Sequence, residues 1–343
     1  MKRFKLLALV LVVTLLIASM LSGCGGNSST APQDPEKKPV AKARTLKLGH
    51  KSSDTHSWQY GSEFFAKLVE ERTNGEIIIE IYPNSQLGDQ KEMTEAAQLG
   101  VIDIVLNAPA TLSSFIPEIG ALDLPFLFRD YDHAFASLDT VGMEYYSPLC
   151  EKADMKLLTF WDTGFKNLSN NDRDIQSVDD IKGLKIRYAG GTTLSGTIEA
   201  LGASAISIPW SETYIALSQG TADAQFNPPS TMYESKIHEV QKYYSSNLSV
   251  QYGAEPVIMS LKTWKELTPE QQEIIMQACA EAATYQRELN IKMDAEALQK
   301  MKDEGVIVTE VSSEVLSEIQ KMTQPVLTKY GDPDLVDAIL AVQ

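Results

Sequence analysis

The sequence predicts an α/β protein whose two lobes form a hinged clamshell around a ligand cleft. Strand and helix patterns alternate twice, first over residues 45–107 and again over residues 164–225. Such alternation is typical of a parallel-rich sheet with helices on both faces. Between Pro269 and Gly305 the chain has neither proline nor glycine. This stretch predicts a helix about 50 Å long, more than the ~30 Å of a small domain, so we expect it to span both lobes.

The first lobe is expected to begin with three strands and two helices in alternation. These five elements cover residues 45–50, 57–74, 76–82, 89–100 and 102–107. Apolar residues on one side indicate the first helix, and Gly75 is its expected stop. An isoleucine run in the second strand indicates burial on both faces. Asp89 and Glu92 have the spacing of a capping box at the start of the second helix.

A second series of elements follows an apolar loop at residues 123–128. We expect helices within 130–153, a strand at 156–162, a short helix capped by Ser177 and Asp180, a strand at 184–188, helices at 192–201 and 211–219, and strands at 222–225 and 256–260. Thr268, Pro269 and Gln271 form a strong start for the long helix. We assign residues 45–163 and 254–290 to lobe I, and residues 164–253 and 291–343 to lobe II.

Residues 1–23 have the features of an export signal. Three basic residues among the first five precede an apolar run that is short for a membrane span of roughly 20 residues. The Leu-Ser-Gly-Cys sequence ending at Cys24 resembles the bacterial lipobox, in which the cysteine carries lipid and becomes the new N-terminus. An uncleaved N-terminal anchor is the alternative. Both place the rest of the chain outside the cytoplasm at a membrane, with residues 24–44 as a flexible tether.

The chain is strongly acidic. Its formal net charge is −16, and loss of residues 1–23, which hold three basic residues and no acid, changes it to −19. A protein with this charge is not expected to bind nucleic acid or anionic lipid head groups. An anionic ligand would need a local positive site, which directs attention to each arginine and lysine near a cleft.

Two cysteines remain in the folded part if Cys24 carries lipid. Cys150 and Cys279 could form a disulfide outside the cytoplasm. We favour two separate buried thiols, because a free cysteine commonly packs as a small hydrophobic residue.

Residues 183–228 hold side chains suited to gripping a small organic anion. Arg187 ends a short strand, Trp210 precedes a helix, and Asn227 lies where a strand stops. A guanidinium offers two parallel donors that match a carboxylate. Because the segment supplies no nucleophile or base, it indicates binding rather than catalysis.

Motifs of common enzymes are missing from the sequence. There is no Gly-x-Ser-x-Gly elbow, phosphate loop, dinucleotide-binding glycine loop or Cys-x-x-Cys pair, and the four histidines lack metal-ligand spacing. We therefore expect neither an enzyme activity nor a metal or other cofactor.

Six short motifs occur in a characteristic order between residues 46 and 310. They are Asn84-Ser85-Gln86-Leu87-Gly88-Asp89, Asp123-Leu124-Pro125-Phe126, Gly183-Leu184-Lys185-Ile186-Arg187, Ser211-Glu212-Thr213-Tyr214, Asn227-Pro228 and Glu239-Val240-Gln241-Lys242-Tyr243. In this order they resemble the DctP-type extracytoplasmic solute receptors of TRAP transporters. The resemblance implies a periplasmic-binding-protein-like clamshell without catalysis. It also implies delivery of an organic acid to an integral-membrane permease driven by an ion gradient.

The same resemblance implies roles for individual residues. Arg187 takes the position of the family arginine that binds the ligand carboxylate, although an inter-lobe salt bridge is the alternative. Trp210 stands where phenylalanine is more usual, and Tyr214 and Asn227 complete the matching motifs. Lys166 stands where many members have a second ligand-binding arginine; a solvated lysine is the alternative. Two further pocket positions fall on Lys51, or possibly His50, and on Asn107.

Trp210 and Phe226 are the clue to the ligand type. Many members have a pocket glutamate where this chain has Phe226, which removes an acceptor for ligand hydroxyl or amino groups. Trp210 adds a wide stacking face. We therefore favour a monocarboxylate with an apolar or aromatic body over a sugar acid, unless Phe226 packs in the core of its lobe. A receptor for a membrane sensor and an extracytoplasmic enzyme acting on acids, such as a lyase, remain the rival functions.

Overall fold

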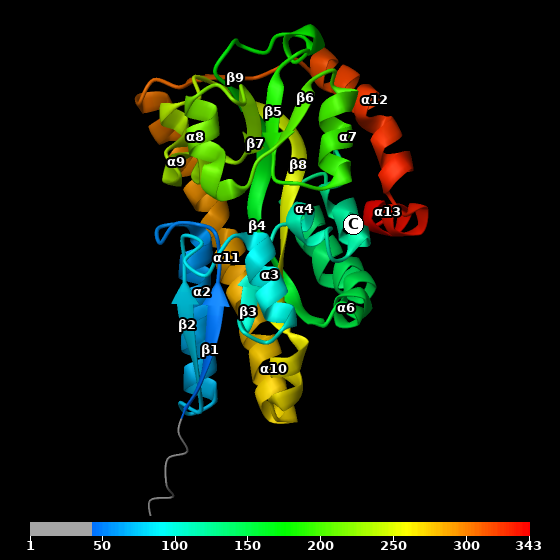
Figure 1. The fold of residues 1–343 in the computed structure, drawn as a ribbon. Coiled ribbons are helices and arrows are strands. Elements are labelled where there is room, and N and C mark those ends of the chain that lie inside the picture. The colour runs from blue at the N-terminus through cyan, green and yellow to red at the C-terminus, as the bar shows by residue number, and fades with distance from the viewer. Residues whose placement is uncertain (1–42) are drawn as a thin grey trace, which may run out of the picture. The chain divides into compact units, whose positions relative to one another are not determined.

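The structure is a computed structural model that describes residues 43–343. Its centre is one nine-stranded sheet with the order β2-β1-β3-β8-β4-β7-β5-β6, and β9 pairs with β8 (Figure 1). The strands are β1 (Arg44–Gly49), β2 (Ile77–Tyr82), β3 (Ile104–Leu106), β4 (Met155–Asn170), β5 (Lys185–Tyr188), β6 (Ser204–Ser207), β7 (Ala224–Asn227), β8 (Tyr243–Ser260) and β9 (Ile307–Thr309).

Two groups of parallel strands form the two lobes. In lobe I, β1 pairs in parallel with β2 and β3. In lobe II, β5 pairs in parallel with β6 and β7. The long antiparallel pair β4 and β8 lies between these groups and belongs to both. The result is the α/β clamshell of two lobes that the sequence predicts, while the exact lobe boundaries remain a prediction.

The expected strands at 156–162 and 256–260 are only parts of β4 and β8. Both strands continue into lobe II. Gly164 and Gly253, two glycines that indicate strand ends when the sequence is read alone, pair with each other inside the ladder of β4 and β8. The register shifts between Asp162 and Gly164, and Gly164 has a φ of +90°. A Cβ atom there would lie 2.5 Å from Asp294 Oδ2, so a bulge built on glycine lets the strand pass.

Helices cover the sheet on both sides (Figure 1). They are α2 (Ser57–Arg72), α3 (Gln90–Gln98), α4 (Pro109–Leu112), α5 (Tyr131–Ser137), α6 (Met143–Lys152), α7 (Thr192–Ala200), α8 (Thr213–Ser218), α9 (Pro229–Glu234), α10 (Leu261–Glu266), α11 (Pro269–Asp303), α12 (Ser313–Tyr330) and α13 (Pro333–Leu340). The capping boxes that begin α3 at Asp89 and α11 at Thr268 are both formed. Sequence reasoning did not assign β6, β9, α4, α9, α10, α12 or α13.

The long helix α11 joins the two lobes as expected. It packs against α2 of lobe I, against the shared strand β4, and against α9 of lobe II. Arg287 of this helix pairs with Asp139 through two hydrogen bonds of 2.7 Å, and it also donates to the Phe160 carbonyl. These contacts hold α11 along both lobes and against the connecting strand β4.

Each lobe has its own hydrophobic core. Leu46, Trp58 and Phe65 belong to the core of lobe I, and Leu168 and Ile186 belong to the core of lobe II. The two cysteines are free and buried in different clusters, which confirms the expectation of separate thiols. None of the helices between residues 43 and 343 has both the length and the hydropathy needed to cross a membrane.

Candidate ligand-binding site

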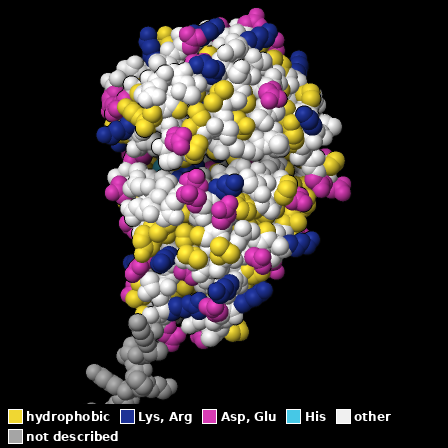
Figure 2. Space-filling view, in the orientation of Figure 1, with side chains coloured by type: hydrophobic (Ala, Val, Ile, Leu, Met, Phe, Trp, Pro, Cys, Tyr) yellow, Lys and Arg dark blue, Asp and Glu magenta, His cyan; other side chains and the backbone are white. Residues whose placement is uncertain are grey.

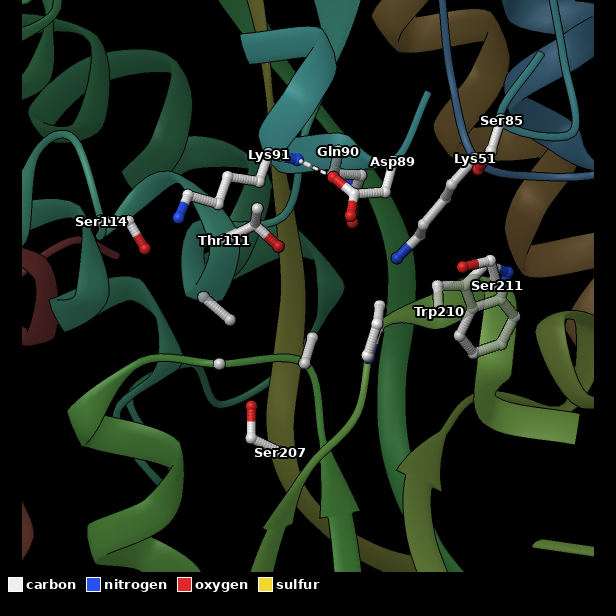
Figure 3. A pocket seen from close by; sticks show the side chains of 14 residues that line it. Lys51, Ser85, Asp89, Gln90, Lys91, Thr111, Ser114, Ser207, Trp210 and Ser211 are labelled. Atoms are coloured by element: carbon white, nitrogen blue, oxygen red, sulfur yellow. Dashed lines mark hydrogen bonds between the residues drawn. The ribbon is translucent and has the colours of Figure 1, made fainter. Parts of the chain in front are cut away.

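A cavity of about 200 Å³ lies between the lobes (Figure 3). Lobe I contributes Lys51, Ser85, Asp89, Gln90, Lys91, Ala110, Thr111 and Ser114, and lobe II contributes Ala189, Gly190, Ser207, Pro209, Trp210 and Ser211. Lys51 follows the carboxyl end of β1, and Gly190 follows the carboxyl end of β5. Ligands of open α/β sheets bind beyond the carboxyl ends of the strands, so this cavity is the candidate ligand site.

Lys51 and Trp210 meet across this cavity. The Lys51 Nζ atom lies 5.2 Å from the centroid of the Trp210 ring and 5.4 Å from that of Trp58. In Figure 3 the Lys51 side chain reaches down from lobe I towards the loop that carries Trp210. Figure 2 shows the crevice between the lobes as seen from outside.

Arg187 lies beneath Trp210 in lobe II. Its guanidinium carbon is 5.5 Å from the ring centroid, and its side chain is 6 % exposed. Nε donates to the Ile208 carbonyl at 2.9 Å, whereas Nη2 has no hydrogen-bond partner. No aspartate or glutamate among residues 43–343 forms a salt bridge with this arginine. Burial lowers the pKa of Arg187 to about 9, so the buried side chain remains a cation at neutral pH.

Lys51 carries a weakened positive charge. Burial lowers its pKa to about 8; the charges of Lys166 and Arg187 also lower it, while those of Glu255 and Asp123 raise it. The side chain is still half-buried at the cavity wall. Lys51 and the four charged groups that shift its pKa therefore form one electrostatic cluster. Of these five residues, the sequence analysis proposed only the three cations as site residues.

Lys166 is held by a protein acid. Its Nζ atom lies 3.4 Å from Oε1 of Glu255, and the lysine side chain is only 13 % exposed. Thr163 donates a hydrogen bond of 3.0 Å to the same oxygen. Lys166 is therefore not a solvated surface lysine. Glu255 was missed because nothing in the sequence of β8 distinguishes a buried acid from an exposed one.

Asn107 and Asn227 have protein partners. Asn107 donates to the Thr94 hydroxyl and accepts a 2.9 Å hydrogen bond from the backbone of Ala108, the residue before α4. Asn227 donates to the side chain of Gln225. In this conformation both amides serve the local structure, and neither lines the cavity.

The remaining candidates, Phe226, Tyr214 and His50, do not line this cavity. Phe226 is 9 % exposed and belongs to the core cluster of lobe II, which is the alternative left open by the sequence. Tyr214 lines a neighbouring cavity that also contacts Lys51 and Trp210, and its hydroxyl donates to Glu239 at 3.2 Å. His50 is fully buried beside Gln59, and burial lowers its pKa to about 4, so it is a neutral structural residue.

The chain matches the family described as bacterial extracellular solute-binding protein, family 7, over residues 48–333. It is 31% identical over 278 residues to the 2,3-diketo-L-gulonate-binding periplasmic protein of Escherichia coli, covering 80% of this chain and 84% of that protein. It is 32% identical over 295 residues to the C4-dicarboxylate-binding periplasmic protein of Rhodobacter capsulatus, covering 85% and 87%.

A solved structure shares the fold. It is a TRAP periplasmic solute-binding protein from Sulfurospirillum deleyianum with bound succinate, 32% identical, with a TM-score of 0.81 over 87% of this chain and 99% of that one. A two-lobed fold with a charged inter-lobe cavity is the architecture of an extracytoplasmic binding protein. The chain belongs to the DctP family of TRAP solute receptors, whose members bind solutes and are not enzymes.

Proposed function

We propose that this protein captures a small organic monocarboxylate with an apolar or aromatic body and delivers it to a TRAP-type membrane permease. The observation that carries the proposal is Arg187, a buried cation without an acidic partner in the described chain. Keeping an unpaired charge buried costs several kcal/mol. A ligand carboxylate would offset that cost with two parallel hydrogen bonds to the guanidinium.

The surroundings of Arg187 support a small acid. Lys51 adds a second cation from the opposite lobe, so an anion between the two would attract both lobes and favour the closed form. Trp210 offers apolar surface to the body of the ligand. Phe226 does not support this part of the proposal, because it lies in the core. The relatives named for diketogulonate and C4-dicarboxylates support an organic acid in general.

A thermal-shift screen tests the proposed ligand class, because a ligand that binds the folded state raises the melting temperature. The panel contains branched-chain and aromatic monocarboxylates, dicarboxylates and sugar acids. We expect the largest shifts from the monocarboxylates with apolar bodies. Shifts from sugar acids or dicarboxylates alone would contradict the proposed ligand class, and the absence of any shift would contradict carboxylate binding.

Membrane attachment is a separate part of the proposal. We propose that Cys24 carries lipid and tethers the receptor beside the permease; this residue lies outside the described part of the chain. Cells fed a labelled fatty acid are expected to label the parent protein and not the Cys24→Ser variant. An equally labelled variant would contradict the assignment of Cys24.

A further inference from the structure

A second cavity, of about 820 Å³, shares no lining residue with the cavity between the lobes. The helices α11 and α12, the start of α5 and the lobe II parts of β4 and β8 contribute to its wall. Four aromatic side chains and one buried acid are among the residues that line it: Phe126, Phe128, Tyr131, Phe165 and Asp294. Its volume lies in the range of sites that hold small organic ligands, and the proposed carboxylate site makes no use of it.

Asp294 of α11 is a buried acid at this cavity and is only 8 % exposed. Its Oδ1 atom accepts a 2.9 Å hydrogen bond from the Ser230 backbone, and its Oδ2 atom accepts a 3.3 Å one from the Tyr131 hydroxyl. None of the salt bridges within residues 43–343 includes this carboxylate. Burial raises the pKa of Asp294 to about 7, although the hydrogen bonds lower it. A cation in the cavity would favour the ionised form.

Aromatic rings lie next to this carboxylate. Tyr131, whose hydroxyl donates to Asp294, meets Phe165 edge to face, with ring centroids 5.1 Å apart and an angle of 81° between the ring planes. Both side chains are half-buried and line the cavity. The face of an aromatic ring attracts cations, and a carboxylate does so as well. This combination favours a ligand with a positive charge and an apolar body over an anion.

Phe126 brings a further ring to the cavity from a strained backbone. Its φ is +55°, in the left-handed region that bulky residues rarely adopt. The Phe126 N–H donates a 2.9 Å hydrogen bond to the Val250 carbonyl on β8, which holds this conformation, and the residue is half-buried. Backbone strain of this kind is concentrated at ligand sites and switch regions. The strained phenylalanine therefore agrees with a ligand site at this cavity.

Two other charged residues line the cavity, and both are exposed. Arg129 donates to the backbone carbonyls of Leu340 and Val342, at 3.1 and 2.7 Å, so its guanidinium is held by the C-terminal segment. Asp130 caps α5 by accepting a 2.8 Å hydrogen bond from the helix backbone. Among the described residues that line this cavity, Asp294 is therefore the only buried charge.

We propose that this second cavity binds a small organic amine in its protonated form, with the ammonium group on Asp294 and an apolar body against Phe165 and Tyr131. The site is separate from the proposed carboxylate site and goes beyond the proposed function. It would give the receptor a second ligand of opposite charge. The acid and the rings contact different parts of this ligand, so charge and apolar surface both contribute to recognition.

Calorimetry with two matched pairs of compounds tests the inference. One pair is 2-phenylethylammonium and 2-phenylethanol, and the other is 3-methylbutylammonium and 3-methylbutan-1-ol. The members of each pair have similar shapes and differ in charge. At pH 8 most Asp294 side chains are ionised, and an aliphatic amine is still protonated. We expect each amine to bind about 10-fold more tightly than its alcohol or better, because a hydrogen bond between two charged groups is stronger than one with a neutral donor.

Two variants with matched controls locate the amine. Asp294→Asn keeps an acceptor for the Ser230 backbone and removes the charge, so the preference for amines should disappear. Its control is Asp130→Asn, which removes an exposed charge from the same cavity and should leave the preference intact. Ile291 lies one turn before Asp294, lines the cavity and is 38 % exposed. Ile291→Lys would place a competing ammonium beside Asp294 and should abolish amine binding, whereas Ile291→Gln should not.

Loss of the amine preference in Asp294→Asn and Ile291→Lys, with both controls unchanged, would support the inference. Equal affinities of amines and alcohols, no binding of either amine, or a preference that survives in Asp294→Asn would overturn it. An equal loss in Asp130→Asn would show a general effect of surface charge and would also overturn it. If Asp294→Asn does not fold, Ile291→Lys decides, because it changes an exposed residue: amine binding that persists in this variant would contradict the site.

Discussion

Arg187 and Trp210 form a cation–π pair, with the guanidinium carbon 5.5 Å from the centroid of the indole ring. Lys51 reaches the same ring from the opposite lobe at 5.2 Å. The two cations repel each other, which is one reason why the pKa of Lys51 is lowered. An anion bound between them would remove this repulsion, so we expect capture of a carboxylate and closure of the lobes to be coupled through this aromatic ring.

The first prediction concerns the stability of the unliganded protein. Arg187→Met removes a buried charge without an acidic partner, so the free energy of unfolding should stay constant or rise by about 1–2 kcal/mol. Urea denaturation measures the change. Arg287→Met is the matched control, because it leaves Asp139 without its two hydrogen bonds and should cost about 2 kcal/mol or more. An equal loss of stability in both variants would show that Arg187 is a structural ion.

The second prediction concerns pH. The pKa of Lys51 is lowered to about 8, so the lysine loses its proton, and its attraction for an anion, as pH rises through 8. The pKa of Asp123 is raised to about 7. Its ionisation near neutral pH adds a negative charge to the cluster, which also weakens the attraction for an anion. Carboxylate affinity should therefore fall between pH 6.5 and pH 9.

Calorimetry across that range measures the effect, and Lys51→Met should remove the part above pH 7.5. Of the other three charged groups of the cluster, Glu255 and Lys166 are paired with each other, and Arg187 has a pKa lowered to about 9, so loss of its charge near pH 9 acts in the same direction. An affinity that stays constant from pH 6.5 to pH 9 in the parent protein would contradict the placement of the ligand beside Lys51.

The third prediction concerns the aromatic wall of the cavity. Trp210→Ala should weaken binding of the preferred acid about 10-fold or more, because in the proposed complex the ring packs against the ligand, and it lies beside both cations. Trp210→Phe should keep most of the affinity. Trp264 is the matched control, since it lies under Lys156 at 5.4 Å on another surface. If Trp264→Ala weakens binding as much as Trp210→Ala, the effect of Trp210 is not local.

The fourth prediction concerns the strands that connect the lobes. Asp162 is fully buried on β4, accepts a hydrogen bond of 3.0 Å from Tyr252, and has a pKa raised to about 8, chiefly by burial. The folded protein therefore holds this proton more tightly than the unfolded chain does. The contribution to stability is complete below pH 4 and is lost as pH rises towards 8.

Asp162→Asn cannot ionise and should lose less stability between pH 5 and pH 9 than the parent does, by up to several kcal/mol. Comparing the two proteins by urea denaturation at each pH cancels the contributions of all other titrating groups. Parallel pH profiles would contradict a protonated Asp162 at neutral pH.

Local patterns in the sequence predicted much of the fold. The capping boxes at Asp89 and Thr268 fixed two helix starts, because cap geometry depends on residues only three apart. The lengths of β4 and β8 were not predictable in this way. Gly164 and Gly253 resemble breaks in the sequence, and only the pairing of distant strands shows that they sit opposite each other.

The candidate site was predictable only in part. Arg187, Lys51 and Trp210 were selected and the structure brings them together. Phe226 was also selected from its motif position, although the alternation of Ala224, Gln225, Phe226 and Asn227 along β7 puts it on the same face as Ala224, which belongs to the core of lobe II. Asp123 was named only as part of a motif, and Glu255 was not named at all. The burial of an acid depends on tertiary packing, and most aspartates and glutamates in a sequence are solvated.

The affinity of the Arg187→Ala variant for the best carboxylate found in the screen tests the central claim most directly. Lys185→Ala, two residues away on the same strand and paired with Asp223, is the charge-matched control. Loss of a buried partner for a charged ligand group costs about 2–5 kcal/mol. We therefore predict an affinity about 100-fold lower or more for Arg187→Ala, with its melting temperature retained and with Lys185→Ala unchanged. Equal affinity of Arg187→Ala and the parent protein would contradict the account.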